Sequence, residues 1–350
     1  MTLHLSKKTC QNNFLIQIIV LISNLYMVFL MVWSGLNHFF HDKWFWLFIL
    51  NSFGIYLFIP FPIFIIFSFL FRKKSLYIVT VVTALLFTYF FASYFLPKPG
   101  WFESTNQPKL TVMTFNTLGA NQSWENTGQV FLNSDADIIA IQELNSNIAK
   151  TIQEKLSLHY PYQALYPQEG TCGTGIISRY PIIEVEMDFT APYWCPDPQV
   201  AKIDFSGQAI ILINFHAKAS SPTGITRIND ENWIRQEQIS EIIRYTQTLT
   251  DPYLVVGDLN ASSLSGAYHS IVQIMNDAWS EGGWGLGHTF PGGNTPGGSR
   301  FKIAGYHLPQ WLVRIDYIFL SSNWATQRTW IGNWDRGSDH RPVITTIFLK

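Results

Sequence analysis

Polar side chains stand at the ends of apolar segments throughout the chain beyond residue 110. They follow or begin runs such as LTVMTF, DIIAIQ and PYLVVG, and they are Asn116, Glu143, His216, Asp258, Asn260, Asp316, Asp339 and His340. Any one of them alone has a structural explanation, because Asn and Asp cap ordinary turns. Together they suit hydrolysis of a phosphate ester. Carboxylate oxygens bind Mg²⁺, a carboxylate can align water, and cationic or amide donors can hold the developing charge.

The apolar segments themselves predict strands covered on both faces, because many are continuous runs of four to seven residues. We expect strands at 110–115, 137–142, 174–178, 200–205, 209–215, 252–257, 314–320 and 343–349. Helices are expected at 145–157 and 229–249, the second of which begins with a capping Asn or Asp. The Gly- and Pro-rich segment 281–300 is too long for a simple connection, and long loops tend to be functional or disordered. The polar residues therefore lie at sheet edges, where several strands can bring side chains together.

Six segments occur in the order typical of a known family: TFNTLG, IAIQEL, NFHAKA, VVGDLNAS, RIDYIFL and GSDHRPV. Over residues 110–350 the chain resembles the endonuclease/exonuclease/phosphatase superfamily, which has the deoxyribonuclease I-like fold. The combination of GDLN, RIDYIF and SDHRPV is specific, whereas each motif alone is weak. The resemblance implies an α/β fold, a four-layer α/β/β/α sandwich of two packed, mainly antiparallel sheets. It also implies a metal-dependent phosphoric ester hydrolase that uses Mg²⁺ or Mn²⁺.

The resemblance assigns a metal-binding role to three residues. Glu143 would bind the metal, Asn116 would help to place metal or phosphate, and Asp339 would be a second carboxylate on the metal side. Nuclease members often carry an acidic residue two positions after the first Asn. That position is Leu118 here, so the resemblance does not supply this metal contact.

The remaining matched residues would be catalytic by the same resemblance. Asp258 would align or deprotonate the attacking water, with Asn260 binding phosphate beside it. His216 would donate a proton or hydrogen bond to the phosphate or leaving group, and the sequence identifies no carboxylate partner for it. Asp316 would orient His340, which would stabilise the charged transition state.

Three uncharged apolar stretches precede this region, at 14–33, 44–71 and 75–96. A membrane-spanning helix needs roughly 20 apolar residues, and each stretch is long enough. The alternative is a signal peptide followed by two core helices. It is disfavoured because the first stretch lacks a small-residue cleavage site and none has a polar face. The middle stretch would cover only about 42 Å as a helix, too short for two crossings, so it predicts one span.

Basic residues predict the orientation of these spans. Lys7 and Lys8 precede the first span, and the basic run at 72–74 separates the second from the third. The positive-inside rule places both in the cytoplasm, so a third span would carry the rest of the chain to the extracytoplasmic side. We expect an integral multi-pass membrane protein with a membrane anchor at 1–97, a linker at 98–109 and a catalytic domain at 110–350.

The charge of the region beyond residue 97 bears on its partners. It holds 17 Lys and Arg against 23 Asp and Glu, a net of −6. A sequence-blind nucleic-acid binder usually has a basic surface, so nucleic acid is the less favoured substrate. The three spans and the RID strand resemble membrane-anchored bacterial members, including those linked to glycopeptide resistance and undecaprenyl-lipid metabolism. We therefore expect the lipid bilayer as partner and a lipid-linked phosphate as substrate, and we infer no protein partner.

Two other functions remain open from the sequence. One is an extracytoplasmic nuclease of the same fold, and the other is a catalytically silent binding module. The aromatic residues Trp279, Trp284, Phe290 and Trp311 would form an apolar wall beside the site in one interpretation and pack in the core in another.

Two cysteines, Cys172 and Cys195, flank the predicted strands 174–178 and 200–205, which we expect to pair as a hairpin. An oxidising compartment would permit a disulfide between them. Two buried free thiols are the alternative.

Overall fold

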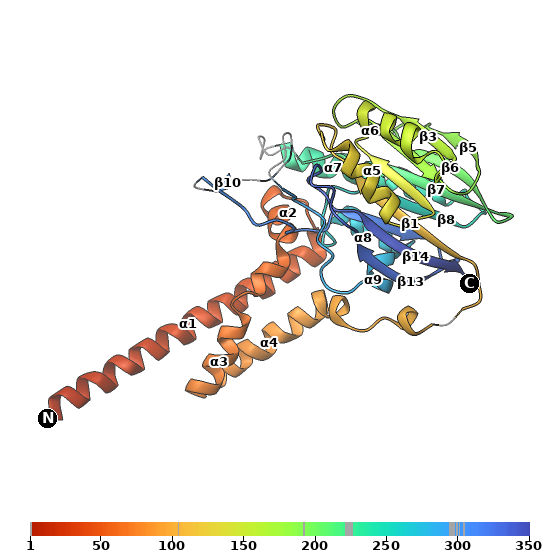
Figure 1. Ribbon diagram of the computed structural model, residues 1–350. Helices are drawn as coiled ribbons and strands as arrows, with labels where there is room; N and C mark the ends of the chain where they lie inside the picture. The colour runs from red at the N-terminus through yellow and green to blue at the C-terminus, as the bar shows by residue number, and fades with distance from the viewer. Residues whose placement is uncertain are drawn as a thin grey trace.

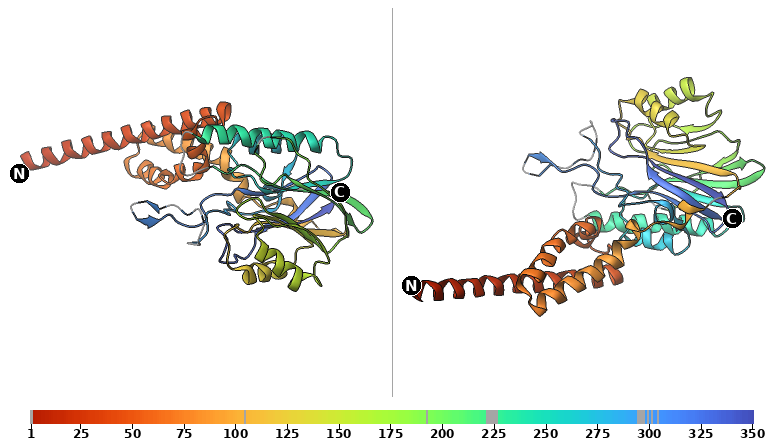
Figure 2. Two further views of the ribbon diagram at one scale, coloured as in Figure 1. Left: turned by 90° about the horizontal axis from the view of Figure 1, so that it is seen from above. Right: turned by 60° about the horizontal axis from the view of Figure 1, so that its bottom comes forward.

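Figure 1 shows the computed structural model of the chain. The structure describes residues 2–350 except 104, 192, 221–226, 294–297, 299, 301 and 304. A region of two sheets and flanking helices lies at one end, and the N-terminal helices extend away from it in all three ribbon views (Figures 1 and 2).

The first sheet has six strands in the order β13-β14-β1-β2-β4-β3. Their bounds are Lys109–Asn116 for β1, Ile138–Gln142 for β2, Tyr162–Tyr166 for β3, Thr174–Ser178 for β4, Trp324–Ile331 for β13 and Val343–Leu349 for β14. Only the β1–β2 pair is parallel among these neighbours.

The second sheet also has six strands, in the order β5-β6-β7-β8-β12-β9. Their bounds are Ile182–Glu186 for β5, Gln199–Phe205 for β6, Gln208–His216 for β7, Tyr253–Asp258 for β8, Asn276–Asp277 for β9 and Asp316–Leu320 for β12. The β7–β8 pair is parallel and the other pairs are antiparallel. A separate hairpin is formed by β10 (Lys302–Ile303) and β11 (Tyr306–His307).

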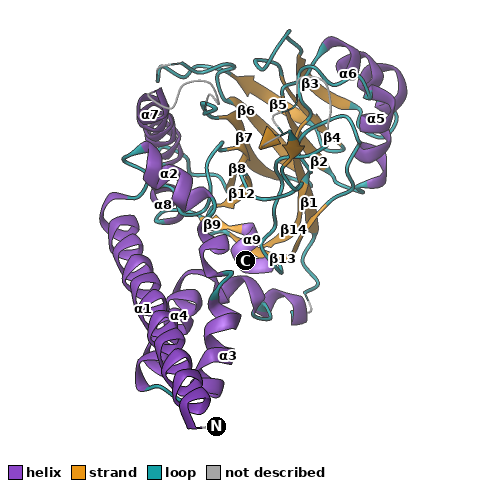
Figure 3. Ribbon diagram, turned by 90° about the vertical axis from the view of Figure 1, so that its left-hand side faces the viewer, coloured by secondary structure: helices purple, strands orange, loops and turns teal. Residues whose placement is uncertain are grey.

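Helices cover the outer faces of both sheets, as Figure 3 shows. On the first sheet these are α5 (Trp124–Asn133), α6 (Ser146–Thr151) and the π-helical turn η4 (Ile152–Leu156), and on the second sheet they are α7 (Ile228–Thr246) and α8 (Gly266–Val272). A short helix, α9 (Ala278–Gly282), supplies Ala278 and Trp279 to the cluster between the sheets. The four-layer α/β/β/α sandwich with mainly antiparallel sheets is confirmed.

Strand β1 illustrates why the apolar runs are continuous. Its alternate residues Leu110 and Val112 belong to the core between the sheets, whereas Met113 and Phe115 pack under α5 and α6. Successive side chains of a strand point to opposite faces, so a strand covered on both faces needs apolar residues at both sets of positions. The eight predicted strands are all present, with bounds that differ by no more than two residues.

The predicted hairpin of 174–178 with 200–205 is wrong. Strand β4 lies between β2 and β3 in the first sheet, and β6 lies between β5 and β7 in the second. On the side where β4 was expected, β6 pairs with β5 instead. Strand β5 is short and largely exposed, with the sequence IIEVE, and the apolar pattern did not reveal it. The chain therefore changes sheets between β4 and β5.

The N-terminal region is helical and contains three segments long and apolar enough to cross a membrane, at 14–40, 54–71 and 74–102. Its elements are α1 (Thr2–Phe40), α2 (Phe45–Ser52), η1 (Gly54–Phe58), α3 (Phe61–Phe71), α4 (Lys74–Phe91), η2 (Ala92–Phe95) and η3 (Pro99–Phe102). The stretch 44–71 is not one continuous helix. It breaks after α2, and Pro60 precedes the first residue of α3.

The end of α1 and the turn that follows it are attached to the sheet region by polar contacts. The Asn37 amide donates to the Leu264 carbonyl over 3.1 Å, and the Gly266 N–H donates to the Asp42 carboxylate over 2.8 Å. Asn232 of α7 donates to the Asp42 carbonyl over 2.7 Å. The N-terminal helices are thus docked on the sandwich.

Contacts from the predicted linker add to this docking. The Lys98 ammonium donates to the Ser280 carbonyl over 2.8 Å, and the Trp101 indole donates to the Gly282 carbonyl over 2.7 Å. Lys98 is buried. The start of the 98–109 segment is therefore packed against α9.

Candidate active site

Strand pairing brings the polar residues of each sheet together. In the second sheet, β8 places Asp258 opposite His216 of β7 on one side and opposite Asp316 of β12 on the other. In the first sheet, Asn116 of β1 lies opposite Gln142 of β2, so Glu143 comes directly after that pair. Residues in register on neighbouring strands are only about 5 Å apart, so each sheet presents a compact set of polar groups.

The two sets meet at the Asp258 carboxylate. The Asn116 amide donates to Asp258 Oδ2 over 3.0 Å and joins the two sheets. The Nε2 atoms of His216 and His340 each lie 3.7 Å from the same oxygen. The other oxygen, Oδ1, accepts the Asn260 N–H over 2.7 Å. Asp258 is 1 % exposed, so these groups converge in a site that excludes most water.

This crowding shifts the pKa of Asp258. Burial, followed by the nearby Asp316 carboxylate, raises the pKa of Asp258 to about 6 from its ordinary 3.8, although His340, His216 and Asn116 oppose the shift. A carboxyl group with this pKa is ionised at neutral pH but retains affinity for a proton. Such a value suits a general base.

His340 is held by Asp316. Its Nδ1 lies 2.9 Å from Asp316 Oδ2 and 3.2 Å from Oδ1. Burial lowers the pKa of His340, but the Asp316 and Asp258 carboxylates outweigh it and hold that pKa well above its ordinary value. The ring is therefore a cation whose Nε2 points to the site. The predicted partnership of Asp316 with His340 agrees with this geometry.

Glu143 is held in place through both carboxylate oxygens. Oε1 accepts the Asn116 amide over 3.0 Å, and Oε2 accepts the Gly119 N–H over 2.9 Å. The backbone at Glu143 is left-handed, with a φ of 54°, and Asn260 has a φ of 53°. Non-glycine residues seldom adopt this conformation, and such positions cluster at functional sites.

The amide of Asn116 is oriented by a backbone contact. Its Oδ1 accepts the Leu118 N–H over 3.0 Å, so its NH₂ group faces the carboxylates of Glu143 and Asp258. Both N–H groups of that amide are donated to carboxylates, so Asn116 orients Glu143 and Asp258. Its role in placing metal or phosphate stays a prediction.

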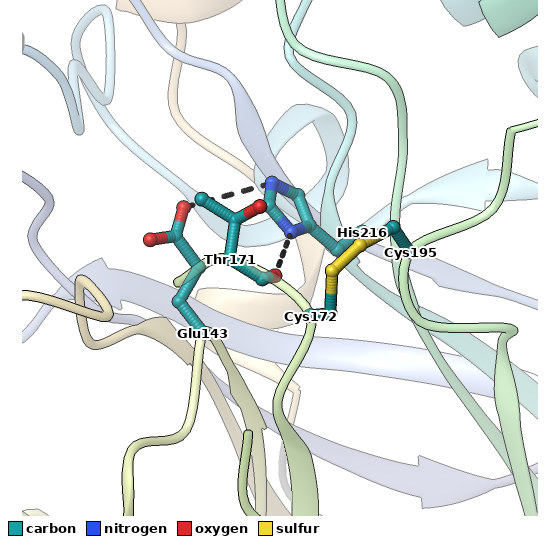
Figure 4. Close-up of a disulfide and its surroundings, with 5 residues drawn as sticks. All are labelled: Glu143, Thr171, Cys172, Cys195 and His216. Atoms are coloured by element: carbon teal, nitrogen blue, oxygen red, sulfur yellow. Dashed lines mark hydrogen bonds and ion pairs between the residues drawn. A yellow bond between two sulfur atoms is a disulfide. The ribbon is translucent and has the colours of Figure 1, made fainter. Parts of the chain in front are cut away.

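His216 has the carboxylate partners that the sequence did not identify. Its Nε2 lies 3.8 Å from Glu143 Oε1 and 3.7 Å from Asp258 Oδ2. On its other side, Nδ1 lies 3.3 Å from the Thr171 carbonyl oxygen (Figure 4). The next residue, Cys172, forms a disulfide with Cys195, with the two Cα atoms 4.6 Å apart. The predicted bridge is confirmed.

The last two predicted residues complete the set. Asp339 is buried, and its Oδ1 lies 3.9 Å from His340 Nε2. Asn260 donates one amide N–H to the Ala217 carbonyl over 3.0 Å, and the second N–H of that amide remains for another acceptor. The side chains of Asn116, Glu143, His216, Asp316, Asp339 and His340 therefore gather around Asp258, while Asn260 lies half-buried beside them.

The donor set fits a divalent cation. Four buried carboxylates, at Glu143, Asp258, Asp316 and Asp339, face only two imidazoles, and this excess of negative charge is what a hard cation relieves. The ligand atoms of Asp258, Asp316 and His340 lie within 4.8 Å of one another. Both Asp316 oxygens engage the His340 cation, whereas the Glu143 oxygens accept neutral N–H groups from Asn116 and Gly119 and keep lone pairs for a metal. Glu143, with the Asp258 carboxylate nearby, would therefore hold Mg²⁺ or Mn²⁺.

Some contributors to the site were not singled out from the sequence. The Ser338 hydroxyl donates to the Asn116 carbonyl over 2.7 Å and accepts the His340 N–H over 2.9 Å. Gly119 has no room for a side chain, because a Cβ there would lie 1.8 Å from the Gly170 carbonyl oxygen. Ser338 and Gly119 lie within the motifs GSDHRPV and TFNTLG, so the sequence could have pointed to them. The Thr171 carbonyl could not be identified from the sequence, because every residue has a backbone carbonyl.

Among the four aromatic residues of the predicted apolar wall, Phe290 is the one that lies against a site histidine. The Phe290 ring lies 5.0 Å from the His340 ring, and the Trp311 ring lies under the guanidinium of Arg341 at 4.4 Å. Trp279 instead packs in the core between the sheets, and Trp284 is 64 % exposed beside Phe95. Core packing was thus the correct alternative for Trp279.

Comparison with known proteins agrees with this fold. Residues 113–340 match the model of the Endonuclease/Exonuclease/phosphatase family, so the chain belongs to that family. A search of curated proteins gave no match.

Solved structures share the fold at low identity. TDP2 from D. rerio, crystallised with a single-strand DNA product, matches with a TM-score of 0.55 and 18 % identity. The match covers 68 % of this chain and 98 % of the TDP2 chain. A family member from Bacteroides thetaiotaomicron has a TM-score of 0.52 and 18 % identity, covering 70 % and 100 %. A mannosyl-6-phosphatase from the same species has a TM-score of 0.51 and 17 % identity, covering 69 % and 100 %.

Proposed function

We propose that this protein is a membrane-anchored, metal-dependent phosphoesterase that hydrolyses a lipid-linked phosphate ester or pyrophosphate on the extracytoplasmic side. The observation that supports it best is the attachment of the segment 261–266 to the N-terminal helices. This segment directly follows Asp258 and Asn260, and its contacts reach Asn37, Asp42 and Asn51. A catalytic strand end held in this way acts close to the bilayer surface.

The side chains have separate tasks in the proposed reaction. Asp258 accepts the proton of the attacking water, because its pKa of about 6 leaves it ionised but basic near neutral pH. The His340 cation, held by Asp316, stabilises the charge that develops on the phosphoryl oxygens. His216, with a proton on both ring nitrogens, donates from Nε2 to the leaving-group oxygen while Nδ1–H stays on the Thr171 carbonyl. A divalent cation bound by the Glu143 carboxylate would supply neutralisation of the phosphate charge.

Two features favour a lipid over a nucleic acid. The region beyond residue 97 carries a net charge of −6, so it gains little from the phosphate field of DNA. Docking on membrane-spanning helices would also raise the effective concentration of head groups at the site. The fold itself leaves the substrate open, because its solved members include one bound to DNA product and one described as a mannosyl-6-phosphatase.

The test is a competition with the full-length protein in nanodiscs at moderate salt with Mg²⁺. We expect undecaprenyl pyrophosphate or another lipid phosphate to be hydrolysed faster than plasmid DNA at matched phosphate concentration. Faster cleavage of DNA would favour the nuclease alternative. No turnover of any phosphate ester by a folded protein would favour the silent binding module.

A pair of matched variants tests the role of docking. Asp42→Ala removes the acceptor of the Gly266 N–H, and we expect it to lower the rate on the lipid but not on a soluble aryl phosphate. Asp204→Ala removes a similar bond to the Gly207 N–H in an exposed turn, and we expect it to change neither rate. Equal losses on both substrates in Asp42→Ala would contradict the positioning of the site at the bilayer.

A further inference from the structure

The disulfide lies one residue from a contact that orients a catalytic histidine. The Thr171 carbonyl lies 3.3 Å from His216 Nδ1, and Cys172 is the next residue (Figure 4). A carbonyl oxygen only accepts hydrogen bonds, so Nδ1 must carry a proton, and a second proton on Nε2 is what makes the ring a donor on its other side. The Nε2 atom then faces Glu143 and Asp258 in the site.

The segment that carries Thr171 has few other restraints near this point. Its ends are fixed to Leu144, because Gln168 donates to the Leu144 carbonyl and Leu144 donates to the Gly173 carbonyl, each over 3.1 Å. Thr171 itself is exposed, between these two contacts. Without the disulfide, these two hydrogen bonds would still hold the ends of the segment. The Thr171 carbonyl between them would be less restrained.

The other half of the bridge is fixed firmly to the sandwich. Glu241 of α7 accepts the Thr190 N–H over 2.6 Å, the Ala191 N–H over 2.9 Å and the Trp194 indole N–H over 2.9 Å. Cys195 follows Trp194 directly. The bridge therefore ties the residue next to Thr171 to a segment that is held on α7.

We propose that the Cys172–Cys195 disulfide is a positioning element for His216, so that the oxidised protein turns over faster than the reduced one. The inference rests on the proposed function, in which His216, protonated on both ring nitrogens, donates from Nε2 to the leaving group. Reduction leaves Glu143, Asp258 and His340 in place and frees the His216 ring to turn. The loss then falls on kcat, because small misplacements of a catalytic group affect the chemical step.

The experiment uses the full chain with Cys10→Ser, so that only the Cys172–Cys195 pair responds to reductant. A phosphine reductant converts the bridge to two thiols and is itself oxidised to the phosphine oxide, and Cys195 is exposed to it. We expect kcat to fall about tenfold on reduction with KM within about twofold, the scale of a misplaced hydrogen-bonding group. Reoxidation should restore it. Unchanged kcat in a fully reduced protein overturns the proposal.

Two variants distinguish a role of the bridge in positioning His216 from a general loss of rigidity on reduction. In His216→Gln, reduction should have no further effect on the remaining turnover, whereas an equal fold-loss there would mean that the bridge does not act through His216. The variant Cys172→Ser/Cys195→Ser should resemble the reduced protein and ignore the reductant. A response to reductant in that variant would also refute the proposal.

A spectroscopic measurement makes the inference independent of turnover. With ¹⁵N-labelled histidine, the oxidised protein should show a His216 ring fixed with a proton held on Nδ1, assigned by its loss in His216→Gln. Reduction should replace it with an averaged signal. If the fixed signal survives reduction, the positioning role is wrong, whether or not the protein hydrolyses phosphate esters.

Discussion

Replacing Asp258 with asparagine should abolish turnover and yet stabilise the metal-free protein at alkaline pH. Holding the pKa of this carboxyl at about 6 instead of 3.8 costs the folded state about 3 kcal/mol at neutral pH. The neutral amide of Asp258→Asn escapes this cost. However, the NH₂ group of the new side chain would face the Asn116 NH₂ across the present 3.0 Å contact. Two donors cannot bond to each other, so this hydrogen bond is lost at a cost of about 1 kcal/mol. The net gain expected is about 2 kcal/mol.

The gain should depend on pH in a defined direction. Because the folded-state pKa of Asp258 is raised above the unfolded value, its favourable contribution is complete below about pH 4 and is lost as pH rises through about 6. The variant lacks this loss. Its advantage should therefore be full at pH 8 and within about 1 kcal/mol of zero at pH 5.

Thermal unfolding of the detergent-solubilised protein in EDTA measures the effect. A gain of about 2 kcal/mol corresponds to a rise in Tm of about 4–8 °C for a domain of this size. Adding Mg²⁺ should narrow the gap, because a bound cation relieves the carboxylate crowding of the wild type. A variant that is less stable than the wild type at pH 8 in EDTA would refute the reasoning.

Asp335→Asn is the matched control. Asp335 is 1 % exposed and accepts four hydrogen bonds, from Asn121, Thr127, Gly337 and Ser338, at 2.6–2.9 Å. An amide can keep only part of this set, so we expect a loss of about 1–3 kcal/mol at both pH values. Stabilisation in both variants would mean that the gain does not come from the electrostatics of Asp258.

Further predictions concern metal, charge and topology. EDTA should abolish turnover and Glu143→Gln should do the same without unfolding the protein, and activity retained in either case would argue against the metal's role. His340→Ala should lower kcat at least about 100-fold with folding intact, as removal of a charge-stabilising group does, and near-normal kcat would exclude that role. Reporter fusions after residue 100 should be active only outside the cytoplasm, and a signal from a cytoplasm-only reporter would overturn the orientation.

Much of the fold was predictable because its cause is local. Continuous apolar runs such as DIIAIQ predict buried strands through the alternation of side chains along a strand, which needs no knowledge of the partner. The positions of the polar residues at the ends of these runs can also be seen in the sequence, whereas their roles were assigned by the family resemblance and stay predictions. The three long apolar helical segments near the N-terminus were predictable from their length and composition alone.

Pairing between distant segments was not predictable from the same signals. The strands at 174–178 and 200–205 are consecutive in the predicted pattern, yet they belong to different sheets, because the weakly apolar strand β5 takes the edge beside β6. Pairing depends on which surfaces are buried against each other, and the sequence of one strand does not carry that information.

The sequence by itself determined which residue types are present for chemistry and their order along the chain: carboxylates, amides and histidines after or before buried strands. Only the tertiary structure decided how they act. It set Asp258 between two sheets, where burial raises its pKa, and it gave His216 two carboxylates and the Thr171 carbonyl as neighbours. It also docked Asp42 on the segment after the catalytic strand. These properties depend on distances between groups far apart in sequence, and burial and charge act through space.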